Sequence, residues 1–278
     1  PPPARHSLGP APTLVAARKA GIREVYKCGG AQAVAAVAYG TETVPRCAKI
    51  VGPGSPYVVA AKRLLAGRID PGIPAGPSEA IVLADAGANP KLAALDLIVE
   101  SEHGPDSSAF LVTDSRAVAE GVRAAVVAYW EHMGPQRAAF SAAVLGGPRG
   151  GVVLARDWDE AVAFVNDYAP EHLQVHAAEP LAQLGRLRHA GEILLGSTTP
   201  IPLGNFVLGP NAVLPTSGWA RTASPLSVFD FLKRSSVAYV TEAAYPELAH
   251  HARVLATYEG FDGHANAVSA LRDAARSG

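Results

Sequence analysis

Residues 79–85 read Glu-Ala-Ile-Val-Leu-Ala-Asp, a short apolar run typical of a buried strand. Comparable runs recur at residues 109–114, 150–155 and 191–196, and longer segments of helical period lie between them. Strands that alternate with helices predict an α/β fold built on a largely parallel sheet.

Helices are expected on this sheet after the first and second runs. Asn89 can cap free N–H groups and Pro90 suits a first helical position, so a helix should run from Pro90 to about His103. Gly104 can end it in a left-handed conformation. Residues 115–133 carry an apolar stripe at helical spacing and should pack on the sheet.

A further helix is expected after Asp157, because Asp157 and Glu160 have the spacing of a capping box. It should stop near Tyr168, since Pro170 disfavours helical geometry at the residue before it. The pair Glu171-His172 is therefore expected on a turn just beyond the helix end.

The composition is that of a globular protein with a small-molecule partner. The 278 residues are 49% hydrophobic, which allows a substantial core. The formal net charge is -1, so the composition favours neither nucleic acid nor an acidic membrane as a partner. Cys28 and Cys47 are too few for a disulfide framework and are expected as small buried residues. Without a recognisable membrane span or signal sequence, a cytoplasmic location is expected.

Two upstream turns, residues 28–32 and 51–55, are rich in glycine and are expected to connect strands to helices. Such turns can present helix N-terminal N–H groups to a phosphate. Neither has the full dinucleotide-binding pattern of glycines, and tight packing would explain the glycines equally well.

Several motifs share their order and spacing with one enzyme family. They are Gly29–Ala33, Gly52–Gly54, Gly76–Glu79, Glu100–Ser107, Ala169–Leu173, Val213–Thr216, Asp230–Arg234 and His264–Val268. In this series the chain resembles the histidinol dehydrogenases over nearly all of its 278 residues. It looks like a divergent member that lacks a sizeable N-terminal portion.

The resemblance implies incomplete Rossmann-like domains followed by a helical C-terminal tail. We expect an NAD-side domain at residues 1–73 and a second domain, with metal and catalytic residues, at 74–225. The helical segment 226–278 is expected to contact the partner of a homodimer. In the family this segment reaches the partner's active site, so active sites would be shared.

A zinc site is expected around Glu100 and His103, which lie three residues apart on one face of the predicted helix. By resemblance, the four ligand positions are Glu100, His103, Asn205 and His264. The family has Gln at the first position and Asp at the third, so the two exchanges preserve formal charge and zinc binding should survive. The alternative is a decayed site, with Glu100 solvated and Asn205 serving a turn.

The catalytic residues implied by the resemblance are Glu171 and His172. His172 would take the alcohol proton, for which histidine has a suitable pKa. Glu171 would activate water for attack on an aldehyde intermediate, which allows a second oxidation with a second NAD. Gln32 and Ser55 lie at the positions of the family's NAD site, where Ser55 replaces the usual Asn.

The substrate positions are mixed. Ser78 and Glu259 match substrate contacts of the family, but Ala212 stands where the family has a histidine. Losing such a contact costs roughly 1–3 kcal/mol. Oxidation of L-histidinol to L-histidine is the leading hypothesis; oxidation of another polar alcohol and a non-catalytic homologue are the alternatives.

Overall fold

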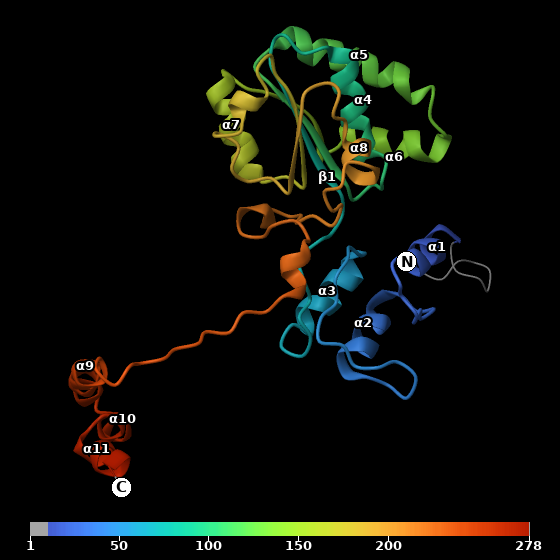
Figure 1. Ribbon diagram of the computed structural model, residues 1–278. Coiled ribbons are helices and arrows are strands. Elements are labelled where there is room, and N and C mark those ends of the chain that lie inside the picture. The colour runs from blue at the N-terminus through green and yellow to red at the C-terminus, as the bar shows by residue number, and fades with distance from the viewer. Residues whose placement is uncertain (1–10, 278) are drawn as a thin grey trace. The chain divides into compact units, whose positions relative to one another are not determined.

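The computed structural model describes residues 11–277 of the chain (Figure 1). The described residues form two compact units, one ending at Phe231 and the other beginning at Leu232. The first unit holds the sheet. The described part of the second holds helices α9, α10 and α11 and no strand. The predicted domain boundaries at 73 and 225 stay predictions.

A five-stranded parallel sheet forms the core of the first unit, in the order β3-β2-β1-β4-β5. The strands are β1 (Glu79–Ala84), β2 (Ser108–Thr113), β3 (Gly150–Leu154), β4 (His172–His176) and β5 (Glu192–Leu195). This confirms the predicted α/β class and all four predicted strands.

The central strand β1 is buried on both faces of the sheet. Ile81 and Leu83 pack in a cluster with α7, whereas Val82 and Ala84 pack in a cluster with α4 and α5. Figure 1 shows α7 on one face and α4, α5 and α6 on the other. The unbroken apolar run of this strand reflects that double coverage.

The helix over one face begins as predicted but ends differently. Helix α4 (Pro90–Ser101) is capped by the Asn89 side chain, which accepts from the N–H of Lys91. The left-handed ending expected at Gly104 is wrong, because Gly104 is not among the glycines with positive φ. Instead, the Arg137 guanidinium donates to the carbonyl of Glu102 at 2.8 Å, just past the last turn.

The stop predicted near Tyr168 is confirmed. Asp157 accepts from the N–H of Glu160, and α7 (Trp158–Tyr168) ends at Ala169, whose φ is 57°. The turn expected at Glu171-His172 is wrong for the second residue, because His172 opens strand β4. All five residues of that strand are buried.

The remaining helices of the first unit lie around the sheet and in the N-terminal part. They are α1 (Ala11–Lys19), α2 (Gly30–Tyr39), α3 (Pro56–Leu64), α5 (Arg116–Trp130), α6 (Pro135–Leu145) and α8 (Ile201–Phe206). Short 3-10 turns lie at Leu181–Gln183, Trp219–Arg221 and Val228–Phe231. The stripe at residues 115–133 is confirmed as helix α5.

The glycine-rich turns precede helices α2 and α3, but the strands expected before them are wrong. The only β-structure in residues 11–73 is an isolated bridge between Lys49 and Asp70. An ion pair of 2.8 Å between the two side chains reinforces it. Cys28 and Cys47 carry free thiols. The burial expected for both is wrong, because Cys28 is exposed and Cys47 is half-buried.

The predicted helical tail is confirmed. It comprises α9 (Tyr245–Tyr258), α10 (Asp262–Ala267) and α11 (Ala270–Ser277). Across residues 11–277, every helix is too short or too polar to span a membrane.

Candidate active site

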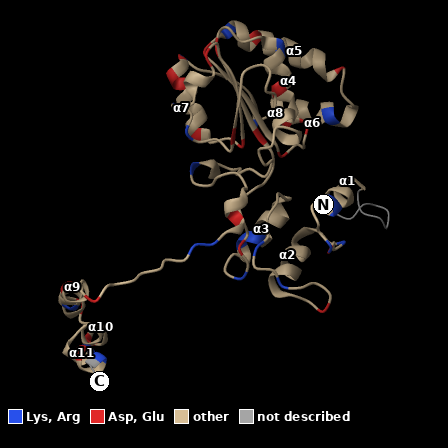
Figure 2. Cartoon of the chain, viewed as in Figure 1, with Lys and Arg blue, Asp and Glu red and all other residues tan. Residues whose placement is uncertain are grey.

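Ionisable side chains gather where the strands begin. Glu79, His172 and Glu192 are the first residues of β1, β4 and β5. Helix α4 returns antiparallel to the strands and brings Glu100 to the same edge, where acidic positions are marked red in Figure 2. Open parallel sheets usually bind ligands at the carboxyl ends of their strands. The site built by these residues therefore lies at the opposite edge.

His172 occupies the centre of this group and is 3% exposed. Its Nδ1 lies 3.1 Å from Glu192 Oε2. Its Nε2 lies 3.9 Å from Glu100 Oε1 and 4.0 Å from Glu171 Oε1. The imidazole thus contacts one carboxyl group directly and faces two others.

Glu171 is a buried carboxyl group whose Oε2 accepts from the backbone N–H of Glu79 at 3.0 Å. Burial raises the pKa of Glu171 to about 8, against the opposing effect of His172. Burial lowers the pKa of His172, but the hydrogen bond to Glu192 and the charge of Glu100 outweigh it, so that pKa is raised. Both groups therefore exchange protons above their usual ranges.

Glu79 lies at the same edge of the sheet as His172, and the sequence analysis did not identify it as a site residue. Its Oε1 accepts from the N–H of Ser217 at 2.9 Å, and its Oε2 is buried without a hydrogen-bond partner. Burial raises its pKa. An acidic residue at the start of an apolar run was the available signal.

The predicted ligand positions of the first unit include two buried oxygens without hydrogen bonds, Glu100 Oε1 and Asn205 Oδ1. Glu100 is 1% exposed, and its Oε2 lies 3.2 Å from His103 Nδ1. The same Nδ1 lies 3.1 Å from the carbonyl oxygen of Val99, while the His103 side chain is half exposed. Nε2 of His103 remains available to a ligand.

Packing of α8 brings Asn205 towards this group. Ile201 of α8 packs in one cluster with Val99, the neighbour of Glu100, and Figure 1 shows α8 beside α4. Gly204 lies against Glu192, because a Cβ on Gly204 would be 2.8 Å from Glu192 Oε1. Asn205 is thus next in sequence to a residue that contacts the partner of His172.

Comparison with known proteins identifies the family. The family model described as histidinol dehydrogenase matches residues 1–272. The chain belongs to the histidinol dehydrogenase family. It is 64% identical to a histidinol dehydrogenase homolog from Mesorhizobium japonicum over 98% of this chain, and 52% identical to a Synechocystis histidinol dehydrogenase over 92%.

A solved histidinol dehydrogenase has the same fold. The crystal structure of the enzyme from Elizabethkingia anophelis superposes with a TM-score of 0.91 at 32% identity, covering 99% of this chain. The chain spans 63% of that protein, and 62% and 59% of the Mesorhizobium and Synechocystis relatives.

The donor set fits the zinc that the histidinol dehydrogenase family implies. Buried oxygens without hydrogen bonds are costly unless another partner satisfies them, and carboxylate, amide and imidazole groups suit zinc. Residues 11–277 contain no group of three or more His, Cys, Asp or Glu side chains placed to hold a metal. Within the first unit, the predicted ligand set supplies only Glu100 and His103 to a group of this kind, because Asn205 is an amide and His264 belongs to the second unit. The zinc site stays a prediction.

The other predicted positions lie on separate elements of the chain. Gln32 lies in the first turn of α2, and Ser55 is the N-cap of α3, where its side chain makes no capping bond. Ser78 directly precedes β1, beside Glu79. Glu259 follows α9 and His264 lies on α10, both in the second unit. The first unit brings together Glu100, Glu171 and His172. Pro56, which follows Ser55, lines a pocket together with Pro77 and Ser217.

The raised pKa values predict how stability depends on pH. Between 4.5, the ordinary pKa of Glu171, and about 8, the folded chain holds a proton that the unfolded chain has lost. Stability should therefore fall as pH rises through this window. The raised pKa of His172 acts in the same direction, because the stability that its proton contributes is lost as pH rises through the pKa of His172 in the folded chain.

We expect Glu171→Gln to flatten this dependence in urea unfolding, measured with a chelator present. Glu131→Gln, at an exposed carboxyl, should keep the wild-type slope. Equal slopes for wild type and Glu171→Gln would contradict the assignment.

Proposed function

We propose that the protein is an NAD-dependent, zinc-assisted dehydrogenase that oxidises a polar alcohol. The observation that carries this proposal is the buried His172, held on one side by Glu192 and facing Glu100 and Glu171 on the other. Membership of the histidinol dehydrogenase family supports the reaction class. L-Histidinol, oxidised through the aldehyde to L-histidine, is the leading substrate.

The first oxidation needs a base for the hydroxyl proton. His172 Nε2 takes this proton and passes it on towards solvent. Bound NAD would accept the hydride, and bound zinc would polarise the alcohol oxygen. Glu100, His103, Asn205 and His264 would hold the zinc, while Gln32 and Ser55 would contact NAD.

The second oxidation needs a water molecule activated for attack on the aldehyde. Glu171 takes a proton from that water, and its carboxylate form is present above its pKa of about 8. Burial beside Glu79 fixes its position, because the backbone N–H of Glu79 holds one carboxylate oxygen. The two residues thus divide the proton transfers of the two steps.

Substrate identity depends on three positions. Ser78 and Glu259 would hold polar groups of the substrate. Ala212 offers a methyl group where the family has an imidazole, which favours a different polar alcohol as the second candidate.

The cytoplasmic location also stays a prediction.

An alcohol panel tests the function with the full-length protein. We expect NADH production with L-histidinol or another polar alcohol. His172→Asn should slow the first oxidation about 10²–10⁴-fold, because it removes the base. Glu171→Gln should mainly slow oxidation of the supplied aldehyde. NAD binding with no turnover of any alcohol would favour the non-catalytic alternative, and equal loss of both steps in both variants would contradict the division of roles.

Zinc titration tests the exchanged pair of ligands. Glu100→Gln should weaken zinc binding, because it removes the only carboxylate assigned to the ligand set. Adding Asn205→Asp should recover part of the affinity, whereas Asn205→Asp alone would bring a second carboxylate to the ion. The cycle should show a coupling of about 0.5–3 kcal/mol. Additive effects would contradict a shared site.

Mixed dimers test whether active sites are shared between subunits. We propose a homodimer in which His264 completes the partner's site. Inactive His172→Asn and His264→Asn chains, mixed and reassociated, should recover activity because one site of each mixed dimer is intact. Sedimentation should show the dimer. A fully active monomer, or mixed dimers without activity, would overturn this proposal.

A further inference from the structure

Glu192 and His172 are direct neighbours across two parallel strands. Their Cα positions are paired in the register of β4 and β5, and each is the first residue of its strand. Paired residues on neighbouring strands point to the same face of the sheet. The carboxylate of Glu192 therefore reaches the imidazole from the side, at 3.1 Å between Oε2 and Nδ1.

The contact fixes which nitrogen of the imidazole carries the proton. The side chains of His172 and Glu192 are 4% and 10% exposed, so water competes little for either group. An ionised carboxylate only accepts hydrogen bonds, so Nδ1–H must donate to it. In the neutral imidazole, Nε2 is then left without a proton.

The same contact directs the free nitrogen into the site. Nε2 faces Glu100 Oε1 at 3.9 Å and Glu171 Oε1 at 4.0 Å. Gly204 of α8 lies against Glu192 and leaves room for the carboxylate. A Cβ there would lie 2.8 Å from Oε1 and 3.0 Å from Oε2. The backbone of α8 thus confines the carboxylate against the histidine.

We propose that Glu192 is a positioning residue for His172. It holds the imidazole in the tautomer with a proton on Nδ1 and keeps Nε2 directed at the reacting atoms. The proposal rests on the proposed function, in which His172 is the base. Carboxylate groups that orient a catalytic histidine in this way are a general means of preparing a base.

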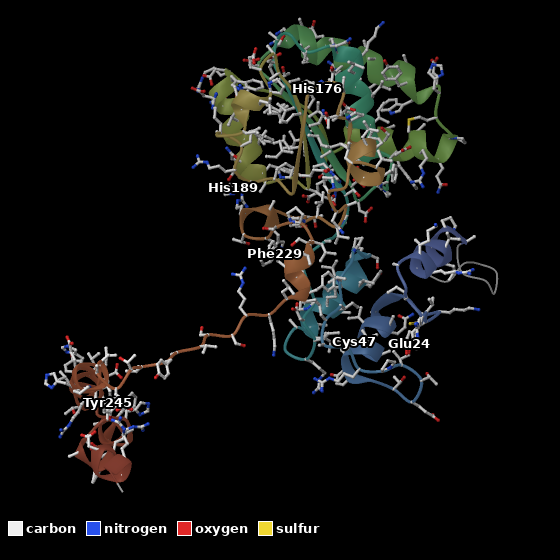
Figure 3. All side chains as sticks on the ribbon, viewed as in Figure 1. Glu24, Cys47, His176, His189, Phe229 and Tyr245 are labelled. Carbon is white, nitrogen blue, oxygen red and sulfur yellow. The ribbon has the colours of Figure 1, made fainter. Side chains whose placement is uncertain are left out.

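A second buried histidine–carboxylate pair provides a matched control. His176, labelled in Figure 3, ends the same strand, and its Nε2 lies 2.7 Å from Asp96 Oδ2. Both residues are buried. Because this pair lies at the carboxyl end of β4, Asp96→Asn disturbs a contact of the same kind away from the site.

Kinetics of the full-length protein test the role. Glu192→Gln preserves the volume of the side chain, but its amide can donate to Nδ1 as readily as accept from it. We expect kcat to fall about 10- to 100-fold, the range for residues that orient a reacting group, with KM and bound zinc unchanged. Glu192→Asp should recover part of kcat, and Asp96→Asn should keep it. Wild-type kcat in Glu192→Gln, or loss of zinc together with activity, would overturn the proposal.

Nitrogen NMR of histidine-labelled protein tests the tautomer without relying on activity. The signals of His172 are assigned as those that disappear in His172→Asn. They are read at a pH at which the imidazole of His172 is neutral, as its own titration shows. Wild type should have the proton on Nδ1, and Glu192→Gln should lose this single tautomer. A proton on Nε2 in wild type, or unchanged signals in Glu192→Gln, would overturn the proposal. An inactive wild type with the expected signals would instead refute the proposed function alone.

Discussion

The gathering of four largely buried carboxyl groups at one edge of the sheet, three of them facing one imidazole, is the constraint on which the site depends. Glu79, Glu100, Glu171 and Glu192 converge at one edge of the sheet, with His172 among them. Buried carboxylates repel one another and lose hydration, so each needs a hydrogen-bond donor, a proton or a cation. Backbone N–H groups donate to one oxygen of Glu79 and one oxygen of Glu171, and His172 contacts Glu192. One oxygen of Glu79 and one oxygen of Glu100 are buried without a hydrogen-bond partner.

Strand direction explains why the charges meet at this edge. Parallel strands all begin at the same side, and each connecting helix returns its last turn there. Helix α4 therefore delivers Glu100 beside the first residues of β1 and β4. The buried network of Ser101, Ser141 and Trp130 fixes this last turn, since the Ser101 and Ser141 hydroxyls lie 2.7 Å apart and the indole donates to Ser141.

The sequence was sufficient for the parts of the fold and site that local pattern determines. Continuous apolar runs predicted four strands, and the spacing of Glu100 and His103 predicted that their side chains meet, which the 3.2 Å distance between them confirms. The prediction that both lie on one helix is wrong for His103, because α4 ends at Ser101. Strand β4 was missed because His172, Gln174 and His176 are polar although buried. Their burial depends on distant partners such as Glu192, Gly196 and Asp96, which no local pattern indicates. Glu192 was missed for the same reason: only strand register places it beside a residue 20 positions earlier.

The position of Glu192 also bears on the amide at Asn205. Gly204 lies against the Glu192 carboxyl group, and Asn205 is the next residue of the same helix. At Glu100 the surroundings differ, because His103 and His172 lie beside the carboxylate and can share its charge. The carboxylate of the predicted ligand set thus lies beside two imidazoles, and the neutral amide of the set follows the residue that contacts Glu192.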